Sequence, residues 1–147
     1  MPHLTAERFA AFAASPEERT PAQRAIVGES DALIAELQAA DVVVLAVPMH
    51  NFSVPSTLRA YFDHVARAGV TFRYTESGPE GLLTGKRAVV IVTRGGYYPE
   101  GADLQLPYLR QFLGFVGIAD VEVVVAERLA VSAEARVSGL GRARETI

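Results

Sequence analysis

The stretch that decides the fold class is DVVVLAVPM, residues 41–49. From Val42 to Val47 it is continuously apolar and mostly β-branched. Such a run predicts a strand that is buried on both faces, because helices cover both sides of a parallel sheet. Two runs of the same kind, residues 88–92 and 121–126, predict two further strands of that sheet.

Helical segments separate these strands. The sequence TPAQ at residues 20–23 is a helix start, because Thr20 can cap, Pro21 suits the first helical position and Gln23 can complete a capping box. Strands that alternate with helices predict an α/β fold with a parallel sheet and right-handed crossovers. We expect helices over residues 20–40, from residue 55 or 56 to Gly69, over residues 103–116, and from residue 132 to near the end.

The remaining segments are less regular. Residues 1–19 are mixed and polar, and we expect a connector with one helical turn near residues 4–12. Residues 70–74 predict a short strand, and residues 75–87, rich in glycine, an excursion. No linker or repeat divides the chain. We therefore predict one domain over residues 1–147, with residues 20–147 as the α/β core.

Composition limits the classes of binding partner and the cellular location that we expect. A length of 147 residues suits one core, and a net charge of -3 gives no basic surface for nucleic acid or an anionic membrane. The chain has no cysteine, which favours a reducing, cytoplasmic location. Its apolar runs are too short to span a bilayer, and its three histidines lack metal-ligand spacing. We expect no partner among nucleic acids, membranes or metals.

Two loops follow predicted strands directly, the place where open parallel sheets bind ligands. The first, Pro48–Ser53, offers apolar side chains beside an amide and an imidazole, a combination that suits the face and edge of a planar heterocycle. The second, Thr93–Tyr98, contains a Gly-Gly pair that allows close approach of backbone to a ligand. From composition alone, an ordinary turn explains each loop equally well or better.

Other polar residues give weaker signals. His64 shares a helix with Arg67, and we expect a surface residue there. Asp41, Asp63 and Glu80 form no obvious acid/base pair.

The loops lie within longer stretches that resemble one family. These stretches are SDALIAELQAADVVVLAVPMHNFSVPSTLRAYFDHVARAGVTFRYTESGPEGLLTGKRAVVIVTRGG, residues 30–96, and PYLRQFLGFVGIADVEVVVAE, residues 107–127. They resemble the FMN-dependent NADH azoreductase family. The resemblance implies a flavodoxin-like three-layer α/β/α fold, bound FMN, and reduction of quinones or azo compounds by NADH in a ping-pong course. It also implies a homodimer with the active site at the interface.

The same resemblance assigns site residues. It implies that the flavin contacts two segments, which are Met49, His50, Asn51 and Phe52, and Thr93, Arg94, Gly95 and Gly96. It also implies that Tyr74 and Phe115 line the substrate side of the pocket, at least one of them across the dimer.

Two departures from the family matter. His50 stands where the family usually has tyrosine. The family's first strand and its Ser-rich phosphate loop have no counterpart before Thr20, so we expect an N-terminally truncated fold with Val42–Val47 at a sheet edge. Without the phosphate donors, FMN binding is expected to weaken by orders of magnitude. Two alternatives stay open: a non-catalytic module that oligomerises or binds a partner through this edge, and an enzyme that uses the cleft for another planar ligand.

Overall fold

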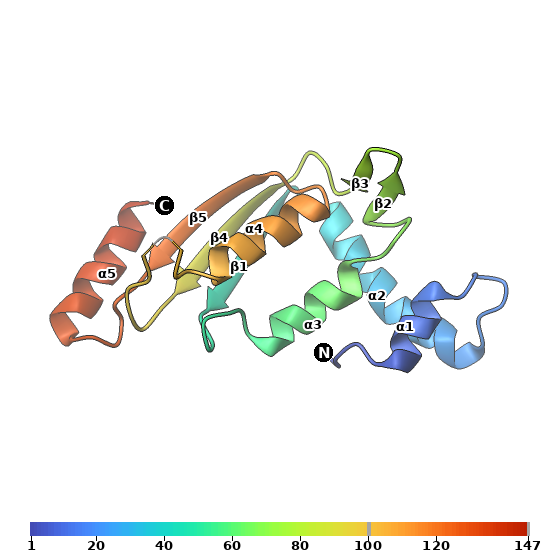
Figure 1. Cartoon of the computed structure of the whole chain (residues 1–147), viewed down its shortest axis with the longest axis horizontal. Coiled ribbons are helices and arrows are strands. Elements are labelled where there is room, and N and C mark those ends of the chain that lie inside the picture. The colour runs from blue at the N-terminus through green and yellow to red at the C-terminus, as the bar shows by residue number, and fades with distance from the viewer. Residues whose placement is uncertain (100, 147) are drawn as a thin grey trace.

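The computed structural model describes residues 1–99 and 101–146. Five helices and five strands follow one another in these residues, as Figure 1 shows. In chain order they are α1 (Ala6–Ala13), α2 (Pro21–Ala39), β1 (Val42–Pro48), α3 (Ser56–Val65), β2 (Phe72–Thr75), β3 (Gly78–Gly81), β4 (Arg87–Thr93), α4 (Gln105–Phe115), β5 (Asp120–Ala126) and α5 (Ala133–Glu145).

The three apolar runs form one parallel sheet in the order β1-β4-β5. The register of β1 on β4 runs from Val42 opposite Arg87 to Pro48 opposite Thr93. The carboxyl ends of the three strands therefore lie at the same edge. The predicted parallel α/β sheet is confirmed.

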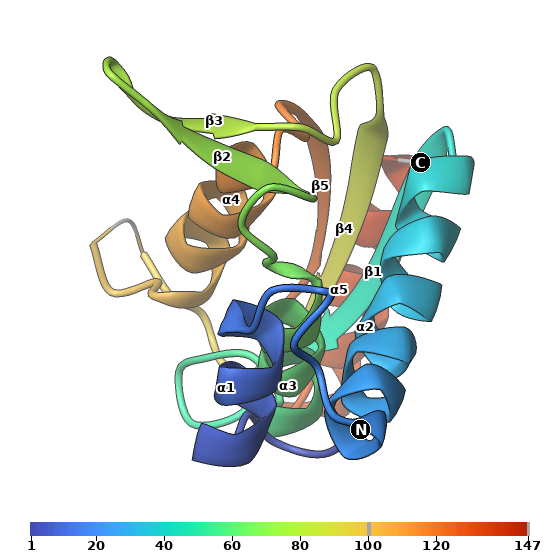
Figure 2. The same cartoon turned by 90° about the vertical axis from the view of Figure 1, so that its right-hand side faces the viewer.

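Helices cover the sheet from two sides, and Figure 2 shows the sheet nearly edge-on. Alternate residues of the central strand, among them Val90 and Val92, are fully buried in the core that includes residues of α2, α3 and α4. Ile91, which points the other way, packs with residues of α5 and β5 in a second cluster. The result is the three-layer α/β/α arrangement.

One part of the sheet has no helix over it. Val42 and Val44 are 51% and 61% exposed, and they point to the same side as Ile91. α5 covers β5 on that side, and β1 pairs with a single neighbour. Among the described residues, β1 thus presents an uncovered apolar face and an unpaired backbone edge.

The start of the chain is more ordered than expected. α1 is a full helix whose cap is the Thr5 side chain, where one turn was predicted. It packs on α2 through an ion pair of 2.7 Å between Arg8 and Glu29. His64 is 1% exposed rather than at the surface, because its Nδ1 meets the Ala60 carbonyl oxygen at 2.8 Å and its Nε2 meets Arg8 at 3.3 Å. The expectation of a surface histidine was wrong.

The predicted short strand near residue 72 belongs to a separate hairpin. β2 and β3 pair antiparallel, Phe72 opposite Gly81, in a two-stranded sheet of their own. The hairpin packs on the end of α4, where Leu83 N–H donates to the Val116 carbonyl at 2.8 Å. Gly81 makes this contact possible, because a Cβ there would lie 2.1 Å from the Gly117 nitrogen.

No helix in the described residues is long and apolar enough to cross a membrane.

Candidate cofactor site

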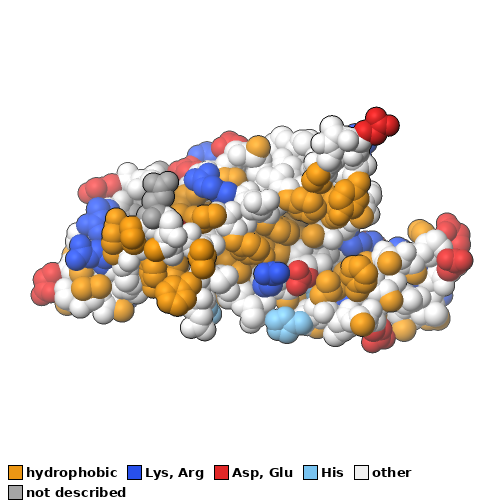
Figure 3. Space-filling model, in the orientation of Figure 1, with side chains coloured by type: hydrophobic (Ala, Val, Ile, Leu, Met, Phe, Trp, Pro, Cys, Tyr) orange, Lys and Arg blue, Asp and Glu red, His pale blue; other side chains and the backbone are white. Residues whose placement is uncertain are grey.

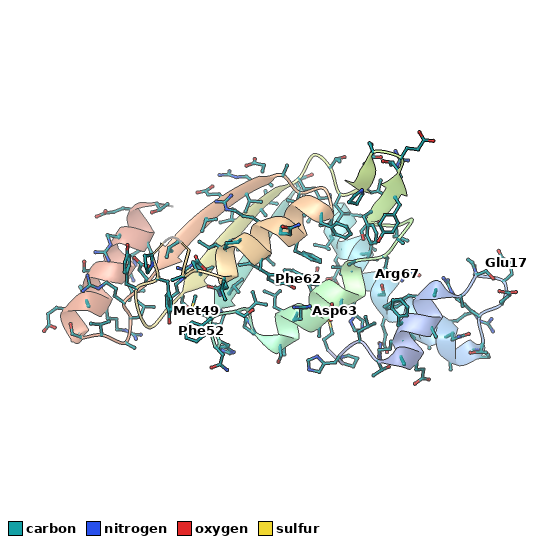
Figure 4. The ribbon with its side chains drawn as sticks, viewed as in Figure 1. Glu17, Met49, Phe52, Phe62, Asp63 and Arg67 are labelled. Carbon is teal, nitrogen blue, oxygen red and sulfur yellow. The ribbon has the colours of Figure 1, made fainter. Side chains whose placement is uncertain are left out.

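The two loops singled out in the sequence meet at the carboxyl edge of the sheet. The Met49 N–H donates to the Thr93 carbonyl at 2.9 Å, which joins the end of β1 to the end of β4. The Phe52 ring lies edge-on to the Tyr98 ring, with 6.0 Å between centroids. Figure 4 shows Met49 and Phe52 close together beyond the end of β1. The structure therefore brings the two predicted segments together.

The first loop is a tight turn with unusual backbone angles. His50 and Ser53 exchange two backbone hydrogen bonds of 2.9 and 3.0 Å around Asn51 and Phe52. Both central residues have positive φ, 48° and 67°. Asparagine tolerates this region, but for a bulky residue such as phenylalanine it is an outlier with strain. The turn holds the Phe52 ring 58% exposed, as a wall beside the edge of the sheet.

The second loop is held by its carbonyl groups. The carbonyls of Arg94, Gly95 and Gly96 accept from the N–H groups of residues 129, 130 and 128, at 2.9 to 3.1 Å. No hydrogen bond occupies the N–H of Gly95 or Gly96 within residues 1–99 and 101–146. Gly95 is exposed and Gly96 half-buried. Two backbone donors on a fixed loop are thus available to a ligand.

The Arg94 side chain points into the protein, which the sequence did not predict. It is 4% exposed, and its Nη2 pairs with the carboxylate of Asp103. Its guanidinium also lies 5.9 Å from the Tyr98 ring centroid. Arg94 therefore supports the loop from inside, and its segment presents backbone rather than a cationic side chain to the edge.

A polar depression of about 360 Å³ adjoins the turn. His50 and Asn51 are exposed on it, and Ser56 and Arg59 from α3 line its floor with Ser53 and Val54. The hydroxyl, amide and guanidinium groups gathered there suit the polar part of a ligand.

Within the described part of the chain, no group of three or more His, Asp or Glu is placed to hold a metal ion.

Tyr74 and Phe115 lie at the opposite end of the sheet. The hairpin that carries Tyr74 packs on residues 116 and 117, which lead into the amino end of β5. Phe115 ends α4 and lies 4.4 Å from the Phe72 ring, which in turn lies 5.5 Å from Tyr74. Strands of seven residues separate this cluster from the two loops, a span of about 20 Å. Within one chain, the two predicted groups do not meet.

An apolar cavity of about 330 Å³ adjoins Tyr74. Its lining comes from α1, α3 and β2, and includes Phe9, Phe12 and Phe72. Figure 3 shows hydrophobic side chains gathered over α1 and the hairpin on this face of the molecule. Phe9 and Tyr74 are 64% and 75% exposed. The cavity is thus open and lined by aromatic rings.

Sequence reasoning assigned no role to three residues of the cofactor edge, although Tyr98 lies within the second predicted loop. Tyr98 forms the second aromatic wall, Asp103 binds Arg94, and Gln105 donates to the Val47 carbonyl at 3.3 Å. Aspartate two residues before a helix is a capping signal, so Asp103 was detectable. Nothing local marks Gln105, because its partner lies 58 residues away.

The arrangement suits a flat, polar-edged ligand. Phe52 and Tyr98 offer apolar surface, and the free N–H groups of Gly95 and Gly96 offer donors that stabilise electron-rich atoms. A ligand of this description has a planar ring with acceptor atoms on one edge. The isoalloxazine ring of a flavin is such a group, so the residues present fit it.

Comparison with known proteins supports the same family. A family model described as "Flavodoxin-like fold" matches residues 1–147. The FMN-dependent NADH:quinone oxidoreductase 6 of Burkholderia lata is 54% identical over 148 aligned positions, which cover 100% of this chain and 75% of that protein. An FMN-dependent NADH:quinone oxidoreductase of Yersinia enterocolitica is 51% identical, with 100% and 74% covered.

Solved structures agree with this result. An azoreductase of Bacillus anthracis matches with a TM-score of 0.86 at 28% identity, covering 98% of this chain and 74% of that one. An FMN-dependent NADH-azoreductase of the same organism, in complex with FMN, has a TM-score of 0.84 at 28% identity, with 98% and 73% covered. The resemblance found in the sequence is confirmed, and the chain belongs to the flavodoxin-like fold family.

Proposed function

We propose that this protein is an FMN-dependent NADH:quinone oxidoreductase that also reduces azo compounds. The observation that carries the proposal is the junction of the two loops, where a strained turn presents Phe52 against Tyr98 of the loop that holds two free glycine N–H groups. Relatives 49–54% identical over the whole chain bear the name of this activity. Support for azo compounds comes from the azoreductase structures.

The residues that would hold FMN come from both loops. They are Met49, His50, Asn51, Phe52, Thr93, Arg94, Gly95 and Gly96. When bound, FMN supplies two-electron transfer between NADH and a quinone. The chain's own groups position the ring: Phe52 excludes water from one side, and the glycine N–H groups donate to the ring's edge.

The placement of the predicted substrate residues supports a homodimer. Tyr74 and Phe115 lie about 20 Å from the loops of their own chain, at the other end of the strands. Their proposed role on the substrate side of the flavin therefore requires a second copy, whose hairpin reaches the first copy's cofactor edge. The exposed Tyr74 ring is suited to such a contact.

Use of NADH as reductant supports a cytoplasmic location.

Flavin binding is the direct test of the cofactor. We expect the purified 147-residue chain to bind FMN in a titration followed by flavin absorption, with the lowered affinity expected without the phosphate donors, and to oxidise NADH when FMN and a quinone are supplied. Gly96→Ala is expected to keep the fold, because its Cβ has no protein atom closer than 3.7 Å, and to weaken FMN about tenfold through contact with the ring. Gly28→Ala is the matched control, since its Cβ meets nothing within 4 Å. A wild-type protein that neither binds FMN in this titration nor oxidises NADH with FMN and a quinone present would contradict the proposal.

Mixing of variants tests the shared active site. Phe52→Ala disables the cofactor edge and Tyr74→Ala the substrate side, so each homodimer should lose activity. A mixed dimer has one site with both residues intact. Random exchange of subunits should restore about a quarter of wild-type activity, because half of the dimers are mixed and each has one working site. Activity that stays at the level of the separate variants would contradict the shared site.

A second candidate is a non-catalytic module that associates through β1. The uncovered face at Val42 and Val44 is the observation in its favour. Apolar, unpaired edge strands are association sites. Self-association without flavin binding or NADH oxidation would favour this candidate.

A further inference from the structure

The carboxylate of Asp103 is shared between a helix and the cofactor edge. One oxygen accepts from the N–H groups of Gln105 and Leu106, at 2.8 and 3.2 Å, and so caps the start of α4. The other oxygen pairs with the buried guanidinium of Arg94. The side chain of Asp103 is only 12% exposed. A buried charge pair of this kind fixes the geometry of both partners, since neither finds water as a substitute.

Gln105 ties the other loop to the same helix end. It is fully buried, and its Nε2 donates to the Val47 carbonyl at 3.3 Å. Val47 precedes the Pro48–Ser53 loop directly, as Arg94 precedes Gly95. Asp103, just before α4, and Gln105, its first residue, therefore hold both loops of the cofactor edge.

We propose that Asp103, Arg94 and Gln105 form a positioning clasp that sets the distance between the Phe52 turn and the Gly95–Gly96 donors. This inference rests on the proposed function, because the clasp acts on cofactor binding. Asp103 is its central residue, since the Arg94 contact and the capping of α4 both depend on its carboxylate. None of the three side chains needs to touch the flavin. They act through the backbone groups that do.

The clasp explains why a charged residue stands before the glycine pair. The carbonyls of Arg94, Gly95 and Gly96 are fastened to residues 128–130 on one side of the loop. The Arg94 side chain fastens the loop to α4 on another side. With both anchors in place, the two glycine N–H groups are presented in one orientation. Loss of the Asp103 anchor leaves the loop attached on one side only.

The test uses two variants and a matched control. Asp103→Asn keeps an oxygen for the helix cap but removes the charge that holds Arg94, and Gln105→Leu keeps volume but removes the link to Val47. Asp31→Asn is the control, because it makes the same charge change in the Asp31–Arg67 ion pair between α2 and the residues that follow α3. We expect FMN to bind at least tenfold more weakly to both clasp variants and equally well to the control, because small misplacements of positioned groups have large effects.

Amide hydrogen exchange on the flavin-free protein gives a readout independent of FMN. The N–H groups of Arg94 and of residues 128–130, which hold the second loop, should exchange faster in Asp103→Asn, and those of Met49, His50 and Ser53 faster in Gln105→Leu, while the strands stay protected. If wild-type protein bound no flavin, the proposed function would fail, yet these exchange rates would still decide whether the clasp exists. Unchanged exchange and affinity in both variants would overturn it. So would faster exchange across the whole sheet, which would mark Asp103 as a residue of general stability only.

Discussion

At the scale of single residues, the turn at Asn51 and Phe52 combines strain with exposure. A phenylalanine at φ 67° destabilises the folded state. Because its ring is more than half exposed, the free energy gained by burying the ring offsets little of this strain. Strain of this kind persists where the surrounding structure over-determines it, and it clusters at functional sites. The His50–Ser53 backbone bonds are the constraint that holds the turn in place.

Substitution of Phe52 separates strain from function. Phe52→Gly and Phe52→Ala remove the same ring, but only glycine adopts the left-handed region freely. We expect Phe52→Gly to be more stable than Phe52→Ala by about 1 kcal/mol in urea unfolding. Both variants should bind FMN more weakly than wild type, because both lack the aromatic wall. Equal stability of the two variants would mean that the turn relaxes without cost.

Single residues also show which features of the site could be predicted from the sequence and which could not. The cofactor loops were predictable, because each follows a continuous apolar strand and their positions depend only on the topology. The inward direction of Arg94 was not, because it depends on a carboxylate nine residues further on. The burial of His64 was missed for the same reason: its ring nitrogens find partners on α3 and on α1, and the partner on α1 is 56 residues away in the chain. Contacts of this range leave no local pattern.

At the scale of elements, the hairpin was the part of the fold that the sequence concealed. The strand β3 reads GPEG, and glycine and proline are depleted in strands. It forms because β2 offers a pairing edge and because Gly81 allows the backbone to approach Gly117. The long helices and the three parallel strands were predicted within a few residues, because periodicity and capping are local signals.

The hairpin's attachment depends on Gly81. A Cβ there would lie 2.1 Å from the Gly117 nitrogen and 2.4 Å from the Val116 carbonyl carbon, both of them backbone atoms that cannot turn aside. We expect Gly81→Ala to lower the free energy of unfolding by about 1–3 kcal/mol. Quinone reduction should fall further than FMN affinity, because Tyr74 is displaced while the cofactor edge is intact. Urea unfolding and flavin titration check the two effects, and Gly28→Ala serves again as control. A loss of FMN affinity equal to the loss of activity would contradict this division.

The docking of α1 is sensitive to acid. The hydrogen bond from Arg8 lowers the pKa of Glu29 below its ordinary value of 4.5, and the charge of Arg8 adds to the effect. A lowered pKa in the folded state means that Glu29 contributes stability above pH 4.5, which is lost as pH falls through the lowered pKa. The stabilities of wild type and Glu29→Gln should therefore differ at neutral pH and converge in acid. Chemical unfolding at several pH values measures this, with Glu76→Gln as control. A constant difference at every pH would refute it.

At the scale of the whole molecule, the sheet is covered unevenly. α2, α3 and α4 lie over one side, and α5 covers β5 on the other, so that Val42 and Val44 stay open. Uncovered apolar strands at a sheet edge promote contact between molecules. This surface reaches toward the cofactor edge, because one depression is lined by Val44, Pro48 and His50.

The uncovered face makes a prediction about assembly. Val42→Lys should reduce self-association at high concentration and leave FMN affinity unchanged, because lysine disfavours pairing at an edge and Val42 does not line the depression next to His50. Val137→Lys is the matched control, since Val137 is 73% exposed and lies on α5. This helix packs on β5, at the opposite edge of the sheet from β1. Light scattering over a concentration series measures the effect. Association that both variants weaken equally would point to general charge repulsion.

The parallel order of the sheet also has a consequence during synthesis. Val42 in β1 pairs with Arg87 in β4, so the ribosome adds the whole intervening segment before these two strands can pair. At about 5–20 residues per second, that takes roughly 2–9 s. α2 and α3 can form meanwhile, because their hydrogen bonds are local. The pairing of β1 with β4 is thus complete only after Thr93 has been added, and a slow codon within β4 would lengthen that interval.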